Sequence, residues 1–295
     1  MEKYLSICIP TNGMTEWVKI VLDSIYSQKI DNSLYEVVIC DNGSEDTLMQ
    51  FINQYYKEKE NLFYKKSTAN GFLNQIECFK LANGKFIKFL NHRAKLKDGA
   101  IERLIDFART HDDSTVVFFS NGALADIGDT KEFNDFDSFV KELSIYSSWS
   151  GGLGIWKSQL EKILEKDTFN SLFPHTDILF FNKSANRYVI DNNLFFSEID
   201  TQHSKKGNYN VFYAFGVEYP NILLQLMTEK YISVETLHYL LLQNCKFVTN
   251  LYRDFIILKK PCSYNLENYK NYLNIFYNEK QIRRHAFFPP VFRRI

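Results

Sequence analysis

The chain has 295 residues, which is enough for one large domain or two modest domains that each bury a full core. Apolar residues make up 45% and charged residues 24%, as in ordinary soluble globular proteins, and no apolar run approaches the roughly 20 residues of a membrane-spanning helix. Because 35 acidic residues balance 35 basic ones, the composition argues against nucleic-acid binding that depends on overall charge.

Five cysteines have neither the spacing of a disulfide framework nor that of a C-x-x-C metal site, and they fit a reducing compartment. No basic-then-apolar leader precedes Tyr4. From the sequence we therefore expect a cytoplasmic protein.

The amino-terminal part of the chain alternates between strand and helix patterns. The runs Tyr4–Ile9 and Tyr35–Cys40 are dense in apolar and β-branched residues, which predicts two buried strands. Between them, Thr15–Gln28 has apolar residues at helical spacing. Parallel strands joined through a helix place their carboxyl ends on one edge of a sheet, where open α/β sheets bind ligands.

The alternation continues as far as Phe119. The same patterns predict helices at Asp46–Tyr56, Phe72–Leu81 and Asp98–Thr110, and strands at Leu62–Tyr64, Phe86–Leu90 and Thr115–Phe119. This order of elements predicts an α/β fold with a doubly wound, mostly parallel sheet.

The second half of the chain is less regular. Tyr188–Ile190 and Leu194–Ser197 predict a strand pair, and Tyr219–Cys245 predicts one or two Leu-rich helices. We therefore divide the chain into a main domain, residues 1–218, and a C-terminal helical appendage, residues 219–295.

Asp41 follows the second predicted strand at the ligand-binding edge of the sheet. A carboxylate accepts hydrogen bonds only, so it suits the N–H or O–H donors of a ligand such as a uracil ring or a ribose. The alternative is an Asx-turn, in which Asp41 accepts a hydrogen bond from the amide of Gly43 or Ser44. Spacing alone does not separate these two roles.

The order of these motifs resembles a known family. The segments LSICIPTNG and YEVVICDNGSED are similar to the start of the family 2 glycosyltransferases, whose nucleotide-binding fold is called GT-A. The resemblance covers Tyr4–Phe119 and, more loosely, Ser147–Phe181. The stretch GFLNQIECFKLANGKFIKFLNHRAKLKDGAIERL is most similar to the bacterial branch around the abequosyltransferases, which build lipopolysaccharide or capsule side chains.

The resemblance implies a nucleotide-sugar donor, which we expect to be UDP-linked. It assigns donor contacts to residues at or near the strand ends: Pro10, Thr11, Asn12, Asp41, Lys66 and Asn70. The first three would contact the base through their backbone, Asp41 would bind the base or sugar, and the last two would form another wall of the nucleotide site.

The Asp-x-Asp triplet of the family is replaced in this chain. In the family, two carboxylates after the fourth strand hold a divalent metal that bridges the donor diphosphate. Here the position is occupied by Asn91, His92 and Arg93, a poor set of ligands for magnesium. The guanidinium of Arg93 can bind phosphate oxygens instead, so we predict no metal and assign Asn91 and Arg93 to the nucleotide. The alternative is a solvated loop whose function has decayed.

Glycosyl transfer with inversion needs a general base that takes a proton from the acceptor hydroxyl. Asp177 matches the position of the family's catalytic carboxylate, and His175 is the rival because its ordinary pKa is closer to neutrality. Asp177 could instead cap its own helix. Trp149 and Trp156 are candidates for stacking on an acceptor sugar, although core packing is the commoner role of a tryptophan.

Two basic segments complete the prediction. His203, Lys205 and Lys206 lie in a polar loop that we expect to close over the diphosphate. The tail Arg283–Arg294 mixes cations with phenylalanines, which suits either peripheral contact with the inner face of an anionic membrane or packing on the protein body.

Together these residues predict an inverting glycosyltransferase that needs no metal. Its acceptor would be a surface glycan, in lipopolysaccharide or capsule, or a lipid-linked oligosaccharide. One alternative is a GT-A-like binding protein that lost catalysis with its acidic triplet. A nucleotidyltransferase ranks last, because Pro10–Met14 lacks the cation of that phosphate loop.

Overall fold

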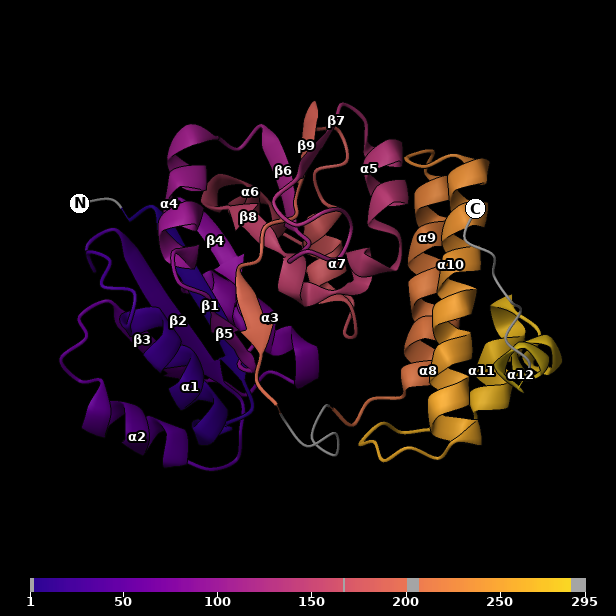
Figure 1. Cartoon of the computed structure of the whole chain (residues 1–295), viewed down its shortest axis with the longest axis horizontal. Coiled ribbons are helices and arrows are strands. Elements are labelled where there is room, and N and C mark those ends of the chain that lie inside the picture. Colours follow the sequence, from indigo (N-terminus) through magenta and orange to yellow (C-terminus); the bar gives the residue numbers. More distant parts are fainter. Residues whose placement is uncertain (1–2, 167, 201–206, 288–295) are drawn as a thin grey trace. The chain divides into compact units, whose positions relative to one another are not determined.

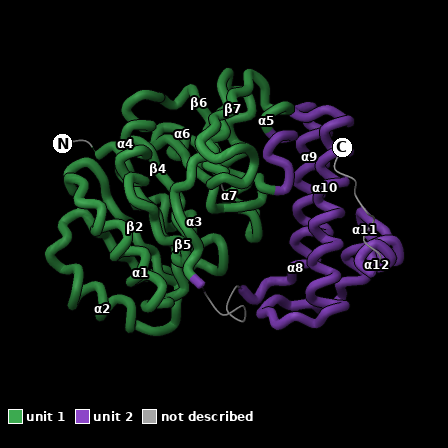
Figure 2. Tube along the Cα trace, viewed as in Figure 1, with its two compact units in different colours: residues 1–139, 146–199 green, residues 140–145, 200–295 purple. Residues whose placement is uncertain are grey.

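The computed structural model describes residues 3–166, 168–200 and 207–287. Within these residues the chain forms two compact units, shown in Figure 2. The first comprises residues up to Phe139 together with Tyr146–Ile199, and the second comprises Val140–Ile145 and the described residues from Asp200 onward. Every residue described below as part of the candidate site belongs to the first unit.

The main sheet of the first unit has the strand order β3-β2-β1-β4-β8. The first four strands run parallel and β8 runs antiparallel to β4. The strands are β1 (Leu5–Thr11), β2 (Tyr35–Asp41), β3 (Leu62–Lys66), β4 (Phe86–Phe89) and β8 (Gly154–Trp156). Both faces of β1 and β2 are buried, which explains why their sequences are almost continuously apolar.

Helices cover this sheet, as Figure 1 shows. In α1 the apolar residues recur at helical spacing and turn into the core: Trp17, Val18, Val21, Leu22 and Ile25. Helix α3 packs against β1 and β2, and α4 packs against β1. The helices of this unit are α1 (Thr15–Tyr26), α2 (Thr47–Tyr55), α3 (Asn74–Lys80), α4 (Ala100–Thr110), α6 (Lys157–Ile163) and α7 (Pro174–Leu179), and α5 (Phe136–Leu143) runs across the division between the units.

Two smaller sheets differ from the predicted arrangement. Thr115–Phe119 forms β6 as predicted, but β6 belongs to a separate sheet of order β6-β9-β7, because β8 occupies the edge beside β4. The predicted strand pair also separates, since β9 joins β6 while β10 pairs antiparallel with β5. The remaining strands are β5 (Ala94–Leu96), β7 (Thr130–Phe133), β9 (Arg187–Asp191) and β10 (Phe196–Glu198).

The second unit is helical. Its helices are α8 (Val211–Tyr213), α9 (Tyr219–Thr228), α10 (Val234–Tyr252), α11 (Tyr269–Phe276) and α12 (Glu279–Phe287), with π-helical turns at Ala214–Glu218 and Arg253–Ile257. In its core the Asn244 side chain donates hydrogen bonds to the carbonyl of Phe215 and to the hydroxyl of Tyr277.

The predicted C-terminal helical region is present, but the compact units divide after Ile199 and not after Glu218. The reason is that α8, the π-turn and α9 follow one another without a break, so residue 218 falls inside a helical run. Among the described residues, no helix combines the length and the apolar character that crossing a membrane requires.

Candidate active site at the strand ends

Three neighbouring strands end side by side at the predicted ligand edge. Thr11 of β1 pairs with Asp41 of β2, and Asp41 pairs with Lys66 of β3. The Asn74 side chain ties two of these ends together, because its Nδ2 donates to the carbonyls of Thr11 at 3.2 Å and Cys40 at 2.8 Å. The prediction that these strand ends meet on one edge of the sheet is thus confirmed.

The loops after β1 and β2 are packed closely against each other. A Cβ atom placed on Gly43 would lie 2.6 Å from the carbonyl oxygen of Asn12, so only glycine fits there. Gly13 has a φ of +84°, in the left-handed region that favours glycine. The two glycines let the loop backbones approach each other beside Asp41.

The Asp41 carboxylate is fully buried and has three partners. It accepts hydrogen bonds from the Gly43 amide at 2.7 Å, from the Tyr64 hydroxyl at 2.8 Å and from Lys66 Nζ at 3.3 Å. The Asx-turn to Gly43 is therefore present. Lys66 also donates to the carbonyl of Glu45 at 2.6 Å, so the predicted wall is held by contacts within the chain. With these three donors and no exposed surface, Asp41 holds the strand ends together, and its direct contact with a donor stays a prediction.

The other predicted nucleotide residues surround this edge. Pro10 is partly buried in β1, while Asn12 is exposed in the loop that follows. Asn70 is also exposed, and its carbonyl accepts the Leu73 amide at the start of the short helical turn before α3.

The Asp-x-Asp position forms a tight turn directly after β4. Asn91 Oδ1 accepts a hydrogen bond from the Arg93 amide at 3.0 Å. His92 turns away from Asn91 and Arg93 into the scaffold: its Nδ1 lies 2.8 Å from Thr11 Oγ1, and its ring meets Trp17 edge-on at 5.3 Å. Burial, followed by the charge of Arg93, lowers the pKa of His92 to about 3. His92 is therefore neutral near pH 7 and supports the loop after β1.

Arg93 lines a small pocket beside this turn. The pocket has a free volume of about 20 Å³ and is lined by Asn91, Arg93, Ala94, Trp149, Gly151, Phe196 and Glu198. The guanidinium carbon lies 5.9 Å from the centre of the Trp17 ring, and no carboxylate of the described residues lies within 4.0 Å of the guanidinium. Asp41 does not line this pocket, so the two predicted donor contacts occupy separate parts of the same edge.

The residues at the Asp-x-Asp position do not fit a divalent metal. Asn91 uses its oxygen within its own turn, His92 uses Nδ1 on Thr11, and Arg93 is a cation. Among the residues that the structure describes, no group of three or more His, Cys, Asp or Glu side chains could hold a metal ion. No chemical step through a metal follows from this donor set.

Asp177 lies in the first turn of α7 and is partly buried. Its Oδ2 accepts a hydrogen bond from the Asn170 amide at 2.7 Å, and the cap residue Phe173 makes no side-chain cap bond. The carboxylate thus fixes the loop before α7, and it does not line the Arg93 pocket. The neighbouring residue Thr176 contacts the segment that leads to the pocket: its hydroxyl donates to the carbonyl of Ser147, two residues before Trp149.

The structure argues against His175 as the base. His175 is buried, and its Nε2 lies 2.7 Å from the Ser148 carbonyl oxygen, so this nitrogen is the donor. Burial lowers the pKa of His175 to about 4. A side chain enclosed in this way cannot reach an acceptor hydroxyl, and its role is to hold the Ser147–Trp149 segment.

The two candidate acceptor tryptophans have different environments. Trp149 is partly exposed and lines the Arg93 pocket. Trp156 is 2% exposed, packs on Phe86 and Phe107, and donates from Nε1 to the Thr115 carbonyl at 2.8 Å. The assignment of Trp156 to the acceptor is therefore wrong, because core side chains cover its ring.

Two residues near the pocket, Glu198 and Lys88, are not among the predicted site residues. Glu198 lines it from β10, where it pairs with Ala94. Lys88 lies behind it, 3% exposed in β4. A lone lysine inside the apolar run Phe86–Leu90 was a signal for Lys88, whereas the three-residue strand that contains Glu198 gave none.

His203, Lys205 and Lys206 lie outside the described residues, as do residues 288–294 of the basic tail. Residues 283–287 form the end of α12.

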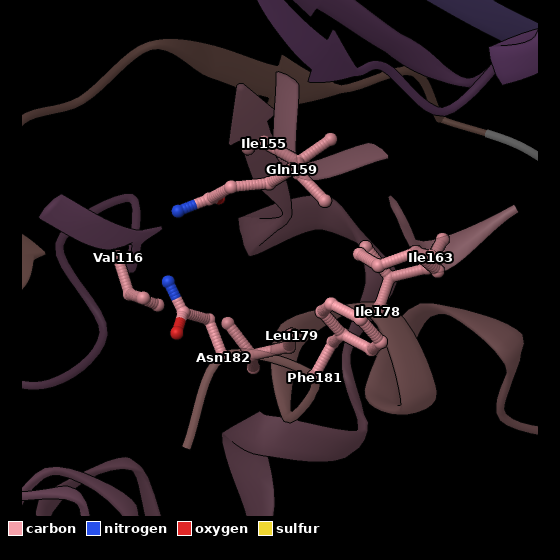
Figure 3. Close-up of a pocket in the computed structure, with 9 residues that line it drawn as sticks. Val116, Ile155, Gln159, Ile163, Ile178, Leu179, Phe181 and Asn182 are labelled. Atoms are coloured by element: carbon pink, nitrogen blue, oxygen red, sulfur yellow. The ribbon is translucent and has the colours of Figure 1, made fainter. Parts of the chain in front are cut away.

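A second recess, shown in Figure 3, lies between β8, α6 and α7. It is lined by apolar side chains together with the amides of Gln159 and Asn182, and its free volume of about 10 Å³ suits about one water molecule. It contains none of the predicted site residues.

The fold, with nucleotide-site candidates at the carboxyl ends of a mostly parallel sheet, is GT-A-like. The family model described as Glycosyl transferase family 2 matches residues 6–190, which is more than half of the chain. The chain therefore belongs to glycosyl transferase family 2.

One curated relative is the poly(ribitol-phosphate) beta-glucosyltransferase of Bacillus spizizenii, which is 27% identical over 108 residues. That match spans 36% of this chain and 17% of the relative's length.

Solved structures show the same fold. The crystal structure of S. aureus TarS 1-349 in complex with UDP-GlcNAc has a TM-score of 0.63 at 17% identity and covers 92% of this chain and 80% of that one. The mannosyltransferase PcManGT from Pyrobaculum calidifontis, in complex with GDP-Man and Mn²⁺, has a TM-score of 0.53 at 12% identity and covers 98% and 88% of the two chains.

Proposed function

We propose that this protein is an inverting glycosyltransferase that moves a sugar from a UDP-linked donor to a surface-glycan acceptor without a divalent metal. The observation that carries the proposal is Arg93, a cation without a carboxylate partner among the described residues, at the position where the family places a metal-binding carboxylate. A guanidinium there would neutralise the charge that develops on the leaving diphosphate.

The donor nucleotide would lie across the strand ends. Asp41 and Lys66 are candidates for the base and ribose side, and Arg93 is the candidate for the phosphates. Because the Arg93 pocket has a free volume of only about 20 Å³, enough for about two water molecules, the donor would lie over the open edge with its diphosphate at the mouth of the pocket. The UDP-GlcNAc complex of TarS supports a UDP-linked donor on this fold.

Asp177 would act as the general base. The transfer forms a bond between the acceptor oxygen and the anomeric carbon and breaks the bond from that carbon to the diphosphate, while the acceptor proton passes to the carboxylate. Asp177 remains partly exposed, unlike His175, and this difference supports the choice. Trp149 would form the acceptor wall.

The acceptor would be a bacterial surface polymer. The relative named for poly(ribitol-phosphate) glucosylation supports this class of acceptor. We retain lipopolysaccharide or capsule side chains as the specific proposal, with the abequosyltransferase-like branch as the nearest subgroup. Contact of the tail Arg283–Arg294 with an inner membrane surface belongs to the same proposal, and sedimentation with anionic liposomes, with and without that segment, tests it.

The experiment is donor turnover by purified protein in EDTA, with UDP-sugars as donors and a lipid-linked glycan as acceptor. Transfer, or slow donor hydrolysis, that persists in EDTA supports the proposal. An obligatory requirement for Mn²⁺ contradicts metal independence. Nucleotide binding with neither transfer nor hydrolysis would favour the inactive binding protein.

A further inference from the structure

Lys88 is a buried cation to which the proposed mechanism assigns no role. It lies in β4, and its side chain is 3% exposed. Its Nζ donates to three carbonyl oxygens, those of Phe89 at 2.9 Å, Gly151 at 2.6 Å and Leu153 at 3.1 Å. An ammonium group has three N–H donors, so each of them has a partner.

Two of these carbonyls belong to the segment Trp149–Leu153, which we call the pocket wall. This segment contains the short helical turn Ser150–Gly152 and leads into β8. Trp149 and Gly151 line the Arg93 pocket, so the ammonium lies directly behind a residue that faces it.

Aromatic rings pack against the glycines of the same segment. A Cβ on Gly151 would lie 2.5 Å from the Trp149 ring, and a Cβ on Gly152 would lie 2.2 Å from the Phe118 ring. Within the turn, Gly152 donates to the Trp149 carbonyl at 3.3 Å and Leu153 to that of Ser150 at 3.0 Å. The rings leave little room for the glycines to move. Lys88 binds the Gly151 carbonyl and shares the Leu153 carbonyl with the Phe89 amide, which donates to it at 3.2 Å.

We propose that Lys88 is a positioning residue: its ammonium group holds the pocket wall in the conformation that places Trp149 and Gly151 beside Arg93. This role rests on the proposed function, because that function identifies the Arg93 pocket as part of the donor site. The bonding itself does not depend on which sugar is transferred.

The charge state of Lys88 supports this role. Burial lowers the pKa of Lys88 to about 7. The groups that face Nζ are the carbonyl of Phe89 in β4, the carbonyls of Gly151 and Leu153 in the wall, and the Phe119 ring of β6 at 5.3 Å. Among the described residues, no acidic or basic side chain lies within ion-pairing distance. Loss of the proton leaves two donors for three carbonyls, so the wall should loosen as the pH rises.

Hydrogen exchange of the ligand-free, full-length protein tests the inference. In Lys88→Met, peptides that span the pocket wall should exchange at least about tenfold faster, because three hydrogen bonds from a charged donor are lost, while peptides from β1 should not change. The matched control is Lys85→Met, which removes the lysine directly before β4 that donates to the carbonyls of Ala108 and His111. This control should leave the wall unchanged.

A pH series separates positioning from a general structural role. After correction for intrinsic chemical rates, exchange of the wild-type wall should rise between about pH 6 and about pH 8.5, and Lys88→Met should lose that dependence. If Lys88→Met does not fold, Lys88→Gln, which also lacks the charge, takes its place in the comparison. Wall exchange in the Lys88 variant that equals the exchange in the Lys85→Met control overturns the inference.

Failure of this inference can be told apart from failure of the proposed function. The exchange experiment needs no nucleotide, whereas UDP binding by the wild type tests the proposed donor. A protein that binds UDP but shows no effect at the wall refutes the role of Lys88 only.

Discussion

Replacement of Arg93 by methionine tests the phosphate assignment. Methionine fills a similar space in the pocket, and the bond from the residue 93 amide to Asn91 survives because it belongs to the backbone. The substitution removes a permanent charge that has no carboxylate partner among the described residues. Its loss therefore leaves no buried acidic group unpaired.

The expected effect follows from the strength of hydrogen bonds to charged groups. Such bonds contribute about 1.5–3 kcal/mol, so Arg93→Met should raise the Kd of UDP by about 10- to 150-fold. Uridine has no phosphate, and its Kd should change less than about twofold because it would not contact Arg93. Isothermal titration calorimetry with UDP and with uridine, in EDTA at constant salt, measures the two Kd values.

Arg109→Met is the matched control. Arg109 lies in α4, where its partners are Asp106 and the ring of Tyr4, so the variant loses the same formal charge away from the strand-end loops. UDP affinity in the control should match the wild type. An unchanged Kd of UDP in Arg93→Met, or an equal loss for UDP and uridine, would refute the assignment.

Three further predictions address the base, the acceptor wall and the buried histidine. Asp177→Asn keeps an acceptor for the Asn170 amide, so it should retain UDP binding while kcat falls by about 10²- to 10⁴-fold; full activity would exclude Asp177 as the base. Trp149→Ala should raise the acceptor KM by about 2- to 10-fold, whereas Trp156→Ala should cost about 3–5 kcal/mol of stability in denaturant titrations; the opposite pattern would restore Trp156 to the acceptor site. Burial holds the pKa of His175 at about 4 in the folded protein. Since an unfolded histidine binds its proton near pH 6.5, the free energy of unfolding should fall by roughly 2 kcal/mol on acidification to about pH 5. His92, with a pKa of about 3, contributes a similar fall. His175→Gln should therefore reduce the dependence of Tm on pH by about half, and an unaltered curve would contradict this origin.

The sequence predicted the parallel part of the main sheet because β1 and β2 are buried on both faces and leave long apolar runs. It did not predict that β8 would pair with β4, or that β5 would pair with β10. Strands β5, β8 and β10 have three residues each, too few for a period to show, and their pairing depends on contacts distant in the chain.

Some residues of the candidate site could be predicted from the sequence and others could not. Asp41, Lys66 and Thr11 could be placed together because each ends a strand of one sheet. The orientation of His92 could not, since its partner Thr11 lies 81 residues away. The burial of His175 likewise depends on Ser147–Trp149, a segment whose path over the sheet no local pattern reveals.

The burial of Lys88 could not be predicted from the sequence. A lysine in an apolar strand usually predicts an edge or a solvent-facing position, yet three carbonyls from the fold satisfy it in the interior. Only the path of the pocket wall explains why a charge is tolerated there.

A crystal structure of the protein with a UDP-sugar in the presence of Mn²⁺ would show whether Arg93 or a metal ion binds the diphosphate. We expect the Arg93 guanidinium within hydrogen-bonding distance of the diphosphate and no anomalous manganese peak that bridges its oxygens. A manganese ion between the phosphates, or a diphosphate bound away from Arg93, would contradict this expectation.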